Sequence, residues 1–313
     1  MPRTSALEIV LRPIEAVVVA TASTQLRAPP LFVIGPPRGG TTLVGLHIFN
    51  TFEFAYFPNV SKLHRKTPYM RARLARGRGA WIASYDNAYG NVNGNLALSD
   101  GWNIFQRWFA PYSEAARGHA ATARGLVKLA ARFEQLFDAP FFAKNNANSM
   151  RIGALAELFP GALFVHVTRG YPEAAASLLE ARKRHGVALN QWWSAAPPQM
   201  LGRKFASEIE QVGATLWGLD RYIEEQLGRL PDERWTSVDY EAFCAYPNEI
   251  LDWIEARYVS AGVGLRQRVC ERPDHFDASR LEPKRRAELE LALAPILERL
   301  EREDPSLAAR DGG

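Results

Sequence analysis

One short segment, residues 31–42, limits the folds that are open to this chain. It reads Leu-Phe-Val-Ile-Gly-Pro-Pro-Arg-Gly-Gly-Thr-Thr, an apolar run typical of a buried strand followed by a glycine-rich turn, and a helix is expected over residues 42–49. Glycines let the backbone N–H groups of such a turn converge on an anion, and the helix N-terminus adds free donors and the positive end of its dipole. The segment therefore predicts a phosphate-binding loop in an α/β fold.

The position of the cation separates this loop from that of nucleoside triphosphatases. Their loop reads G-x-x-x-x-G-K-[ST], and in the frame Gly35 to Gly40 the lysine position is held by Thr41. The strong cation is Arg38, inside the loop. This arrangement resembles the 5′-phosphosulfate loop of sulfotransferases that use 3′-phosphoadenosine 5′-phosphosulfate (PAPS), where Lys or Arg is followed by Ser or Gly and then Gly-Thr-Thr. The resemblance implies that the following residues bind PAPS: Arg38, Gly39, Gly40, Thr41 and Thr42.

A second motif lies in residues 162–182. Its apolar start predicts another buried strand, and Pro172 suits the first turn of a helix, where its missing N–H has no partner to lose. Arg169 follows the strand, and Ser177 lies about two helical turns further on. Sulfotransferases have the same Arg and Ser pairing and use it for the 3′-phosphate of PAPS. Arg suits that role because its planar guanidinium bonds phosphate oxygens bidentately.

The resemblance to PAPS-dependent sulfotransferases covers about residues 30–255. It includes the segment around Lys144, which looks like the Lys-Thr-Pro or Lys-Asp-Pro segment of the family, and the Tyr-Glu turn after residue 235. Residues 191–197 and 89–92 resemble a bacterial branch of carbohydrate-type or tyrosylprotein-like enzymes associated with surface polysaccharides.

The expected architecture is a single α/β domain with a P-loop-like, doubly wound parallel sheet flanked by helices. Strands are predicted near residues 31, 141, 163 and 235, with helices between them. Residues 1–29 form an N-terminal helical segment and residues 30–313 the sulfotransferase domain. Within that domain we expect an acceptor-side insertion over about 55–135 and a C-terminal helix over about 283–303.

Sulfuryl transfer requires that the charge developing on the departing bisphosphate be stabilised, that the acceptor hydroxyl lose its proton, and that water be excluded. Arg38 and the loop backbone meet the first need. Lys144 follows a predicted strand, so it should lie at the strand's carboxyl end, where ligands bind in open α/β sheets. Two cations can do the work of a magnesium ion, so no metal is expected.

The general base is harder to place. Several relatives have a catalytic Glu about twenty residues beyond the loop cation, but this chain has Pro58 and Asn59 there, and neither can act as a base. Asp100 is the leading substitute, because it precedes an aromatic segment suited to an acceptor pocket; His64 and Glu53 are the alternatives. A structural role is open for each of the three, as a turn residue, a member of a basic face or a local ion-pair partner.

Composition restricts the partners and the compartment. The net charge of +4 suits a polyanionic nucleotide but, without a basic stripe and interleaved aromatics, does not indicate nucleic acid. The densest basic stretch, residues 62–78, reads as a solvated helix face or as an acceptor-binding wall.

Two cysteines are too few for a disulfide framework, so a reducing, cytoplasmic location is expected. Residues 16–22 are apolar, but Glu8, Arg12, Pro13 and Glu15 interrupt the preceding stretch, and the uncharged run that remains is too short to cross a bilayer. Residues 6–22 should form one or two helical turns on the domain, with peripheral membrane contact left open.

Two other functional classes share these features. A nucleotide or sugar kinase would have a phosphate loop, but it should also have a Walker lysine, and Arg169 and Ser177 would have no role in it. A catalytically decayed nucleotide-binding protein would keep the fold and lose the cations, which are present here. The acceptor is a carbohydrate or a phenol, and the carbohydrate is favoured.

Overall fold

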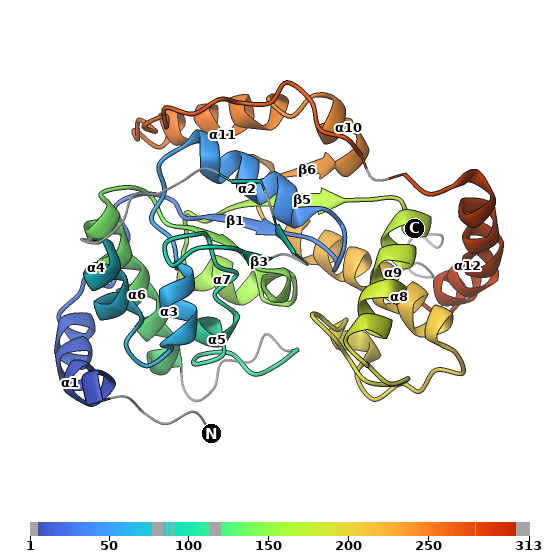
Figure 1. Ribbon diagram of the computed structural model, residues 1–313, viewed down its shortest axis with the longest axis horizontal. Coiled ribbons are helices and arrows are strands. Elements are labelled where there is room, and N and C mark those ends of the chain that lie inside the picture. The colour runs from blue at the N-terminus through green and yellow to red at the C-terminus, as the bar shows by residue number, and fades with distance from the viewer. Residues whose placement is uncertain are drawn as a thin grey trace.

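The computed structural model describes residues 6–76, 84–85, 87–88, 91–112, 120–278 and 280–304. Four parallel strands form its central sheet in the order β4-β1-β5-β6, and helices flank both faces (Figure 1). The strands are β1 (Leu31–Ile34), β4 (Phe142–Lys144), β5 (Leu163–Thr168) and β6 (Trp235–Asp239). The predicted α/β class and the four predicted strand positions are confirmed.

The hydrophobic pattern of β1 explains its central place in the sheet. All four of its residues are fully buried, and alternate side chains point to opposite faces. Leu31 and Val33 belong to the apolar core on one face of the sheet, whereas Phe32 and Ile34 belong to the core on the other. Because β1 is covered on both faces and paired on both edges, the loop that follows it starts from a fixed position.

The helices on the two faces come from different parts of the chain. Helices α2 (Thr41–Thr51), α10 (Tyr240–Ala245) and α11 (Glu249–Ser260) lie on one face, and α6 (Ala120–Phe137) and α7 (Ile152–Leu158) lie on the other (Figure 1). A third group, α8 (Tyr171–Arg184), α9 (Glu208–Leu227) and α12 (Pro283–Glu303), packs together beside the sheet. The remaining elements are α3 (Asn59–Leu63), α4 (Pro68–Arg76), α5 (Trp102–Phe105), the hairpin β2 (Asn87–Ala88) and β3 (Asn91–Val92), and the 3₁₀ turns η1 (Asn146–Met150), η2 (Pro198–Met200) and η3 (Asp232–Arg234).

The N-terminal helix α1 (Ala6–Ala20) is longer than the one or two turns expected from the sequence. It packs against α4 and α6, and the carboxylate of Glu15, which is buried, accepts hydrogen bonds from the backbone N–H groups of Tyr69 and Met70 at 3.1 and 2.8 Å. These tertiary contacts stabilise a helix that a short apolar run does not specify by itself. None of the described helices has both the length and the apolar character needed to cross a bilayer.

Candidate active site

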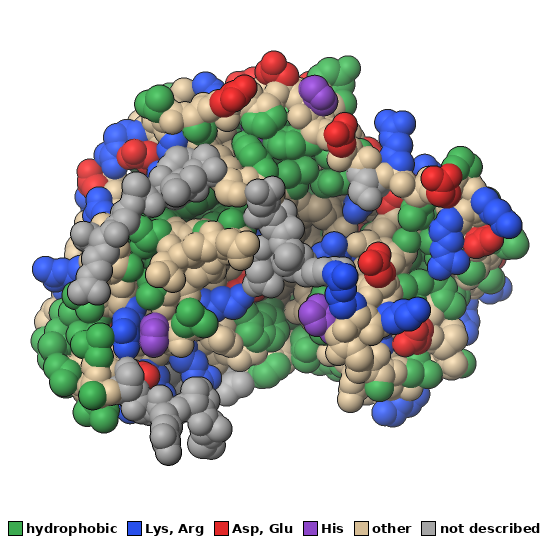
Figure 2. All heavy atoms as spheres, viewed as in Figure 1, with side chains coloured by type: hydrophobic (Ala, Val, Ile, Leu, Met, Phe, Trp, Pro, Cys, Tyr) green, Lys and Arg blue, Asp and Glu red, His purple; other side chains and the backbone are tan. Residues whose placement is uncertain are grey.

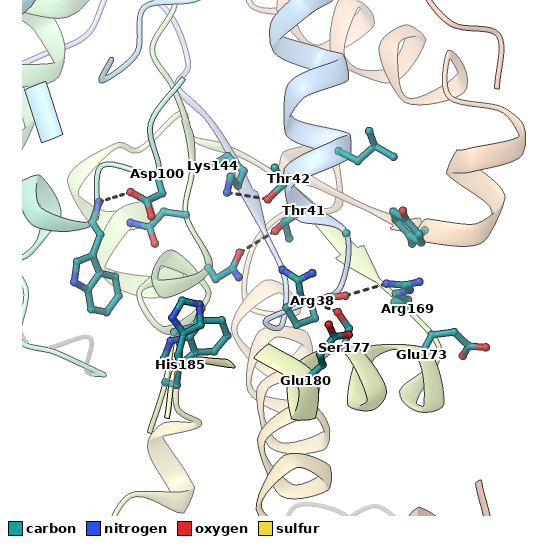
Figure 3. A pocket seen from close by; sticks show the side chains of 18 of the residues that line it. Arg38, Thr41, Thr42, Asp100, Lys144, Arg169, Glu173, Ser177, Glu180 and His185 are labelled. Carbon is teal, nitrogen blue, oxygen red and sulfur yellow. Dashed lines mark hydrogen bonds between the residues drawn. The ribbon is translucent and has the colours of Figure 1, made fainter. Parts of the chain in front are cut away.

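A cavity of about 760 Å³ opens at the carboxyl ends of the sheet strands (Figure 3). Each of the four strands delivers a side chain to it: Arg38 from the loop after β1, Lys144 from the end of β4, Arg169 from the residue after β5, and Tyr240 from the residue after β6. Open α/β sheets bind ligands at this edge. Three of these four side chains are cations, so the cavity is built to attract an anion.

The turn before α2 has a backbone that few residues other than glycine adopt. Gly40 has a φ of +95°, and a Cβ atom there would lie 2.0 Å from a ring carbon of Tyr240. Arg38 also has a positive φ, +68°, which is uncommon for a residue with a side chain. The turn is anchored by Ser149 of η1, whose hydroxyl accepts a hydrogen bond from the N–H of Gly35 at 2.9 Å and donates one to its carbonyl at 3.0 Å. The phosphate loop is therefore held in shape by the neighbouring segment.

The two motifs expected to bind phosphate meet in space. The Nε of Arg38 donates a hydrogen bond to the hydroxyl of Ser177 at 2.8 Å, and Arg169 donates one to the carbonyl of Arg38 at 3.3 Å (Figure 3). Arg169 lies over the ring of Tyr240, 4.4 Å from its centroid, and its Nε is 3.2 Å from a carboxylate oxygen of Glu241. These contacts fix the guanidinium of Arg169 at the cavity.

Lys144 is buried, with 6% of its side chain surface exposed, and its Nζ donates a hydrogen bond to Thr42 Oγ1 at 3.1 Å. Desolvation lowers the pKa of Lys144; the charges of Lys62 and Arg38 lower it further, and that of Asp100 opposes the shift. A buried ammonium group surrounded by other cations is costly until an anion compensates it. The residues present therefore fit a polyanion such as the phosphosulfate end of a nucleotide.

Asp100 lines the cavity on the side opposite α8 (Figure 3). One of its carboxylate oxygens lies 3.2 Å from Lys62 Nζ and accepts a hydrogen bond from the N–H of Trp102 at 3.1 Å. The side chain remains about a third exposed, at 32%. Asp100 thus combines the turn role expected of an Asp before Gly with a position inside the cavity.

The other two candidates for the base lie elsewhere. Glu53 is outside the cavity lining and pairs with Arg266, Nε to Oε2, at 2.6 Å. It follows the carboxyl end of α2, about 16 Å along that helix from the phosphate loop. His64 follows α3 and is also outside the lining; desolvation lowers its pKa, and Arg71 lowers it further.

The polar residues of the cavity that sequence reasoning missed include Glu180 and His185. Glu180 lies three residues after Ser177 on α8, and this helical spacing, which puts them on one face, was a usable signal. His185 follows the last residue of α8, and its ring stacks on that of Trp193, with centroids 5.3 Å apart. Only the return of the chain through residues 186–202 brings this pair to the cavity.

Aromatic side chains form one wall of the cavity. The wall is made by the following residues: Trp102, Tyr112, Trp192 and Trp193. The hydroxyl of Tyr112 donates a hydrogen bond to the carbonyl of Trp192 at 3.3 Å, which joins two segments of the wall. Arg182, which is buried, donates to the carbonyls of Ala188 and Gln191 at 3.0 and 2.9 Å and fixes the approach to Trp192.

Within the described ranges, no group of three or more His, Cys, Asp or Glu side chains is placed to hold a metal ion. The expectation that the reaction needs no metal stays a prediction.

Comparison with known proteins identifies the family. The model of the sulfotransferase family matches residues 29–257. Sulfotransferase STF9 from Mycobacterium avium has a similar fold, with a TM-score of 0.51 and 15% identity over 92% of this chain and 73% of the solved one. Sulfotransferase STF1 from Mycobacterium tuberculosis H37Rv gives a TM-score of 0.50 and 16% identity over 96% of this chain and 82% of the solved one. A comparison with curated protein sequences gave no significant match. The family match covers well over half of the chain, which belongs to the sulfotransferase family and is an enzyme of the sulfuryl-transferring class.

Proposed function

We propose that this sulfotransferase moves the sulfuryl group of PAPS to a hydroxyl group of a carbohydrate or glycoconjugate by in-line displacement. The observation that carries the proposal is the meeting of Arg38, Lys144, Arg169 and Ser177 at one cavity. A kinase would need a Walker lysine in place of Thr41, and both the loop sequence and the family match favour sulfuryl transfer over that alternative.

The donor would be held at its two charged ends by the two motifs. The turn Gly39 to Thr42 and Arg38 would take the 5′-phosphosulfate through backbone N–H groups and a charge-assisted hydrogen bond. Arg169 and Ser177 would take the 3′-phosphate, since a guanidinium and a hydroxyl together can satisfy several phosphate oxygens. When bound, PAPS supplies an activated sulfuryl group with a bisphosphate leaving group.

The protein's part in the chemistry would be divided among four side chains. Lys144 and Arg38 would stabilise the negative charge that develops on the leaving group, in a buried site where such stabilisation is strong. Asp100 would accept the proton of the acceptor hydroxyl, because it lines the acceptor side of the cavity and a base must reach the attacking oxygen from there. Lys62, 3.2 Å away, would orient the carboxylate.

A carbohydrate acceptor suits the wall that faces this chemistry. Trp rings stack well on the apolar faces of sugars. Asp100, Glu180 and His185 stand around the same cavity and could bond several hydroxyl groups at once. A phenol would use the rings, but its single hydroxyl group would bond few of these polar groups.

A transfer assay with PAPS labelled in its sulfuryl group tests the proposal. Polysaccharide fragments, glycolipids and simple phenols are offered in turn, with Arg38→Ala as the inactive reference. We expect label on one of the carbohydrate classes and none with the variant. Label on phenols alone would overturn the acceptor assignment. The donor assignment would be overturned if PAPS labelled no acceptor and the protein consumed ATP with magnesium instead.

A further inference from the structure

The exposed face of α1 has an unusual composition. All of its exposed residues are apolar, and they are Ala6, Leu7, Ile9, Val10, Pro13, Ile14, Ala16, Val17 and Ala20. Ile9, Val10 and Val17 are exposed to 62, 60 and 65%. A surface helix usually turns its charged residues to water and its apolar stripe to the core, so α1 is inverted.

The charged residues of α1 point toward the protein. Glu15 is buried and bonded to the start of α4, and Glu8 is 3.6 Å from Arg12 and largely covered. In Figure 2, hydrophobic side chains gather at the lower left, where Figure 1 places α1, and Lys and Arg side chains border them. A contiguous exposed apolar face of this kind marks an interaction surface.

Helix α4, which packs against α1, and the residues before it carry positive charge. Between residues 59 and 76 the described chain has no carboxylate, while it has six cations: Lys62, Arg65, Lys66, Arg71, Arg73 and Arg76. A second cavity, of about 450 Å³, lies directly beside α1 and is lined by Arg12, Arg65, Lys66, Gln106 and Arg107. Four cations around one cavity form a site for an anionic group such as a phosphate.

We propose that α1 and this second cavity form a docking surface for a membrane rich in anionic lipids. The apolar face of α1 would enter the boundary between headgroups and acyl chains, with the helix lying in the membrane plane. The cavity at Arg12 and Lys66 would receive a lipid phosphate, and the exposed Arg65, Arg73 and Arg76 would be attracted to the charged surface.

A second copy of the chain fits this face less well. The helix is about 22 Å long, so its face provides only a few hundred Å², well below the roughly 800 Å² that each partner buries in a stable interface. Two copies would also bring the cations around α1 close to one another, whereas an anionic bilayer neutralises them.

Co-sedimentation of the full chain with lipid vesicles tests the proposal. We expect binding to vesicles of phosphatidylcholine mixed with phosphatidylglycerol, weakened by added salt, and no binding to phosphatidylcholine alone. The double substitution Val10→Ser and Val17→Ser should lower the affinity at least tenfold, because two apolar side chains no longer enter the membrane. Lys66→Gln with Arg73→Gln should lower it about 25-fold, at about fivefold for each cation.

Matched controls make the test specific. Val259→Ser with Val269→Ser removes two side chains that are at least as exposed, at 65 and 104%, but distant from α1 in sequence, and should leave vesicle binding unchanged. Lys144→Ala should also bind vesicles normally, which separates this surface from the transfer reaction. Retained binding after the Val10 and Val17 substitutions would overturn the proposal, as would absence of binding to anionic vesicles. A dimer in sedimentation equilibrium that these substitutions convert to a monomer would assign the face to a second copy instead.

Discussion

The Nε of Arg38 donates a hydrogen bond to the hydroxyl of Ser177 at 2.8 Å, across 139 positions of sequence. The pair joins the loop after β1 to the helix after β5, and Arg169 adds a third link through the carbonyl of Arg38. Neighbouring parallel strands put these residues at one edge of the sheet, so the proposed donor site follows from the topology.

The first prediction concerns Ser177. Ser177→Ala should weaken the binding of 3′-phosphoadenosine 5′-phosphate, the product of PAPS, because a hydrogen bond to a charged group contributes about 1.5–3 kcal/mol. Titration calorimetry should therefore show a dissociation constant at least tenfold higher. Ser260→Ala is the control, since that hydroxyl bonds only within its own helix at 2.8 Å. Equal affinities for the Ser177 variant and the parent protein would remove Ser177 from the nucleotide site.

The second prediction separates two cations. Lys144→Ala should mainly lower kcat, on the order of 2.7–4 kcal/mol of lost transition-state stabilisation, because Lys144 is buried beside the phosphate loop. Arg169→Ala should mainly raise the dissociation constant of the nucleotide through lost contacts to the 3′-phosphate. Steady-state kinetics with parallel calorimetry distinguish the two effects, and a Lys144 variant with normal kcat would disprove the role given to it.

The third prediction tests the base. Asp100→Asn keeps the size and most of the hydrogen bonding of the side chain but removes its basicity, so kcat should fall about a hundredfold or more while nucleotide affinity stays nearly constant. His64→Gln and Glu53→Gln are the controls, and we expect near-normal turnover in both because neither residue lines the cavity. A large loss in either control with Asp100→Asn unaffected would transfer the role.

The fourth prediction concerns the turn. Gly40→Ala should unfold the phosphate loop locally and abolish nucleotide binding, because the added Cβ would lie 2.0 Å from the ring of Tyr240 and φ is +95°. Gly186→Ala is the matched control: its φ is +61°, but no atom lies within 4 Å of the added carbon. That variant should lose only about 1 kcal/mol of stability to backbone strain and keep its nucleotide affinity. Similar binding defects in the two variants would point to backbone strain and not to the contact with Tyr240.

The sequence allowed the sheet and the placement of Lys144 and Arg169 at strand ends to be predicted, because both depend on local signals: an apolar run, a glycine-rich turn and the residue after a strand. The inverted exposure of α1 could not be predicted in this way. An amphipathic pattern predicts that the apolar face of a helix meets the core, and in α1 the buried hydrogen bonds of Glu15 turn a charged residue inward instead.

The stacking of His185 on Trp193 was also beyond local reasoning, since their contact depends on how residues 186–202 fold back over the cavity. Glu53 was close to the loop in sequence but is separated from it by the whole length of α2. Distance along the chain was therefore a poor guide to the base.

Titration calorimetry of the protein with 3′-phosphoadenosine 5′-phosphate, adenosine 5′-phosphate and ATP tests the proposed donor most directly. We predict tightest binding of the bisphosphate, no requirement for magnesium, and a gap between the two adenosine phosphates that closes in Arg169→Ala. At about a hundredfold above its dissociation constant the bisphosphate should also add roughly 2.7 kcal/mol to the free energy of unfolding. Equal affinities for all three nucleotides, or tightest binding of ATP with magnesium, would contradict the account.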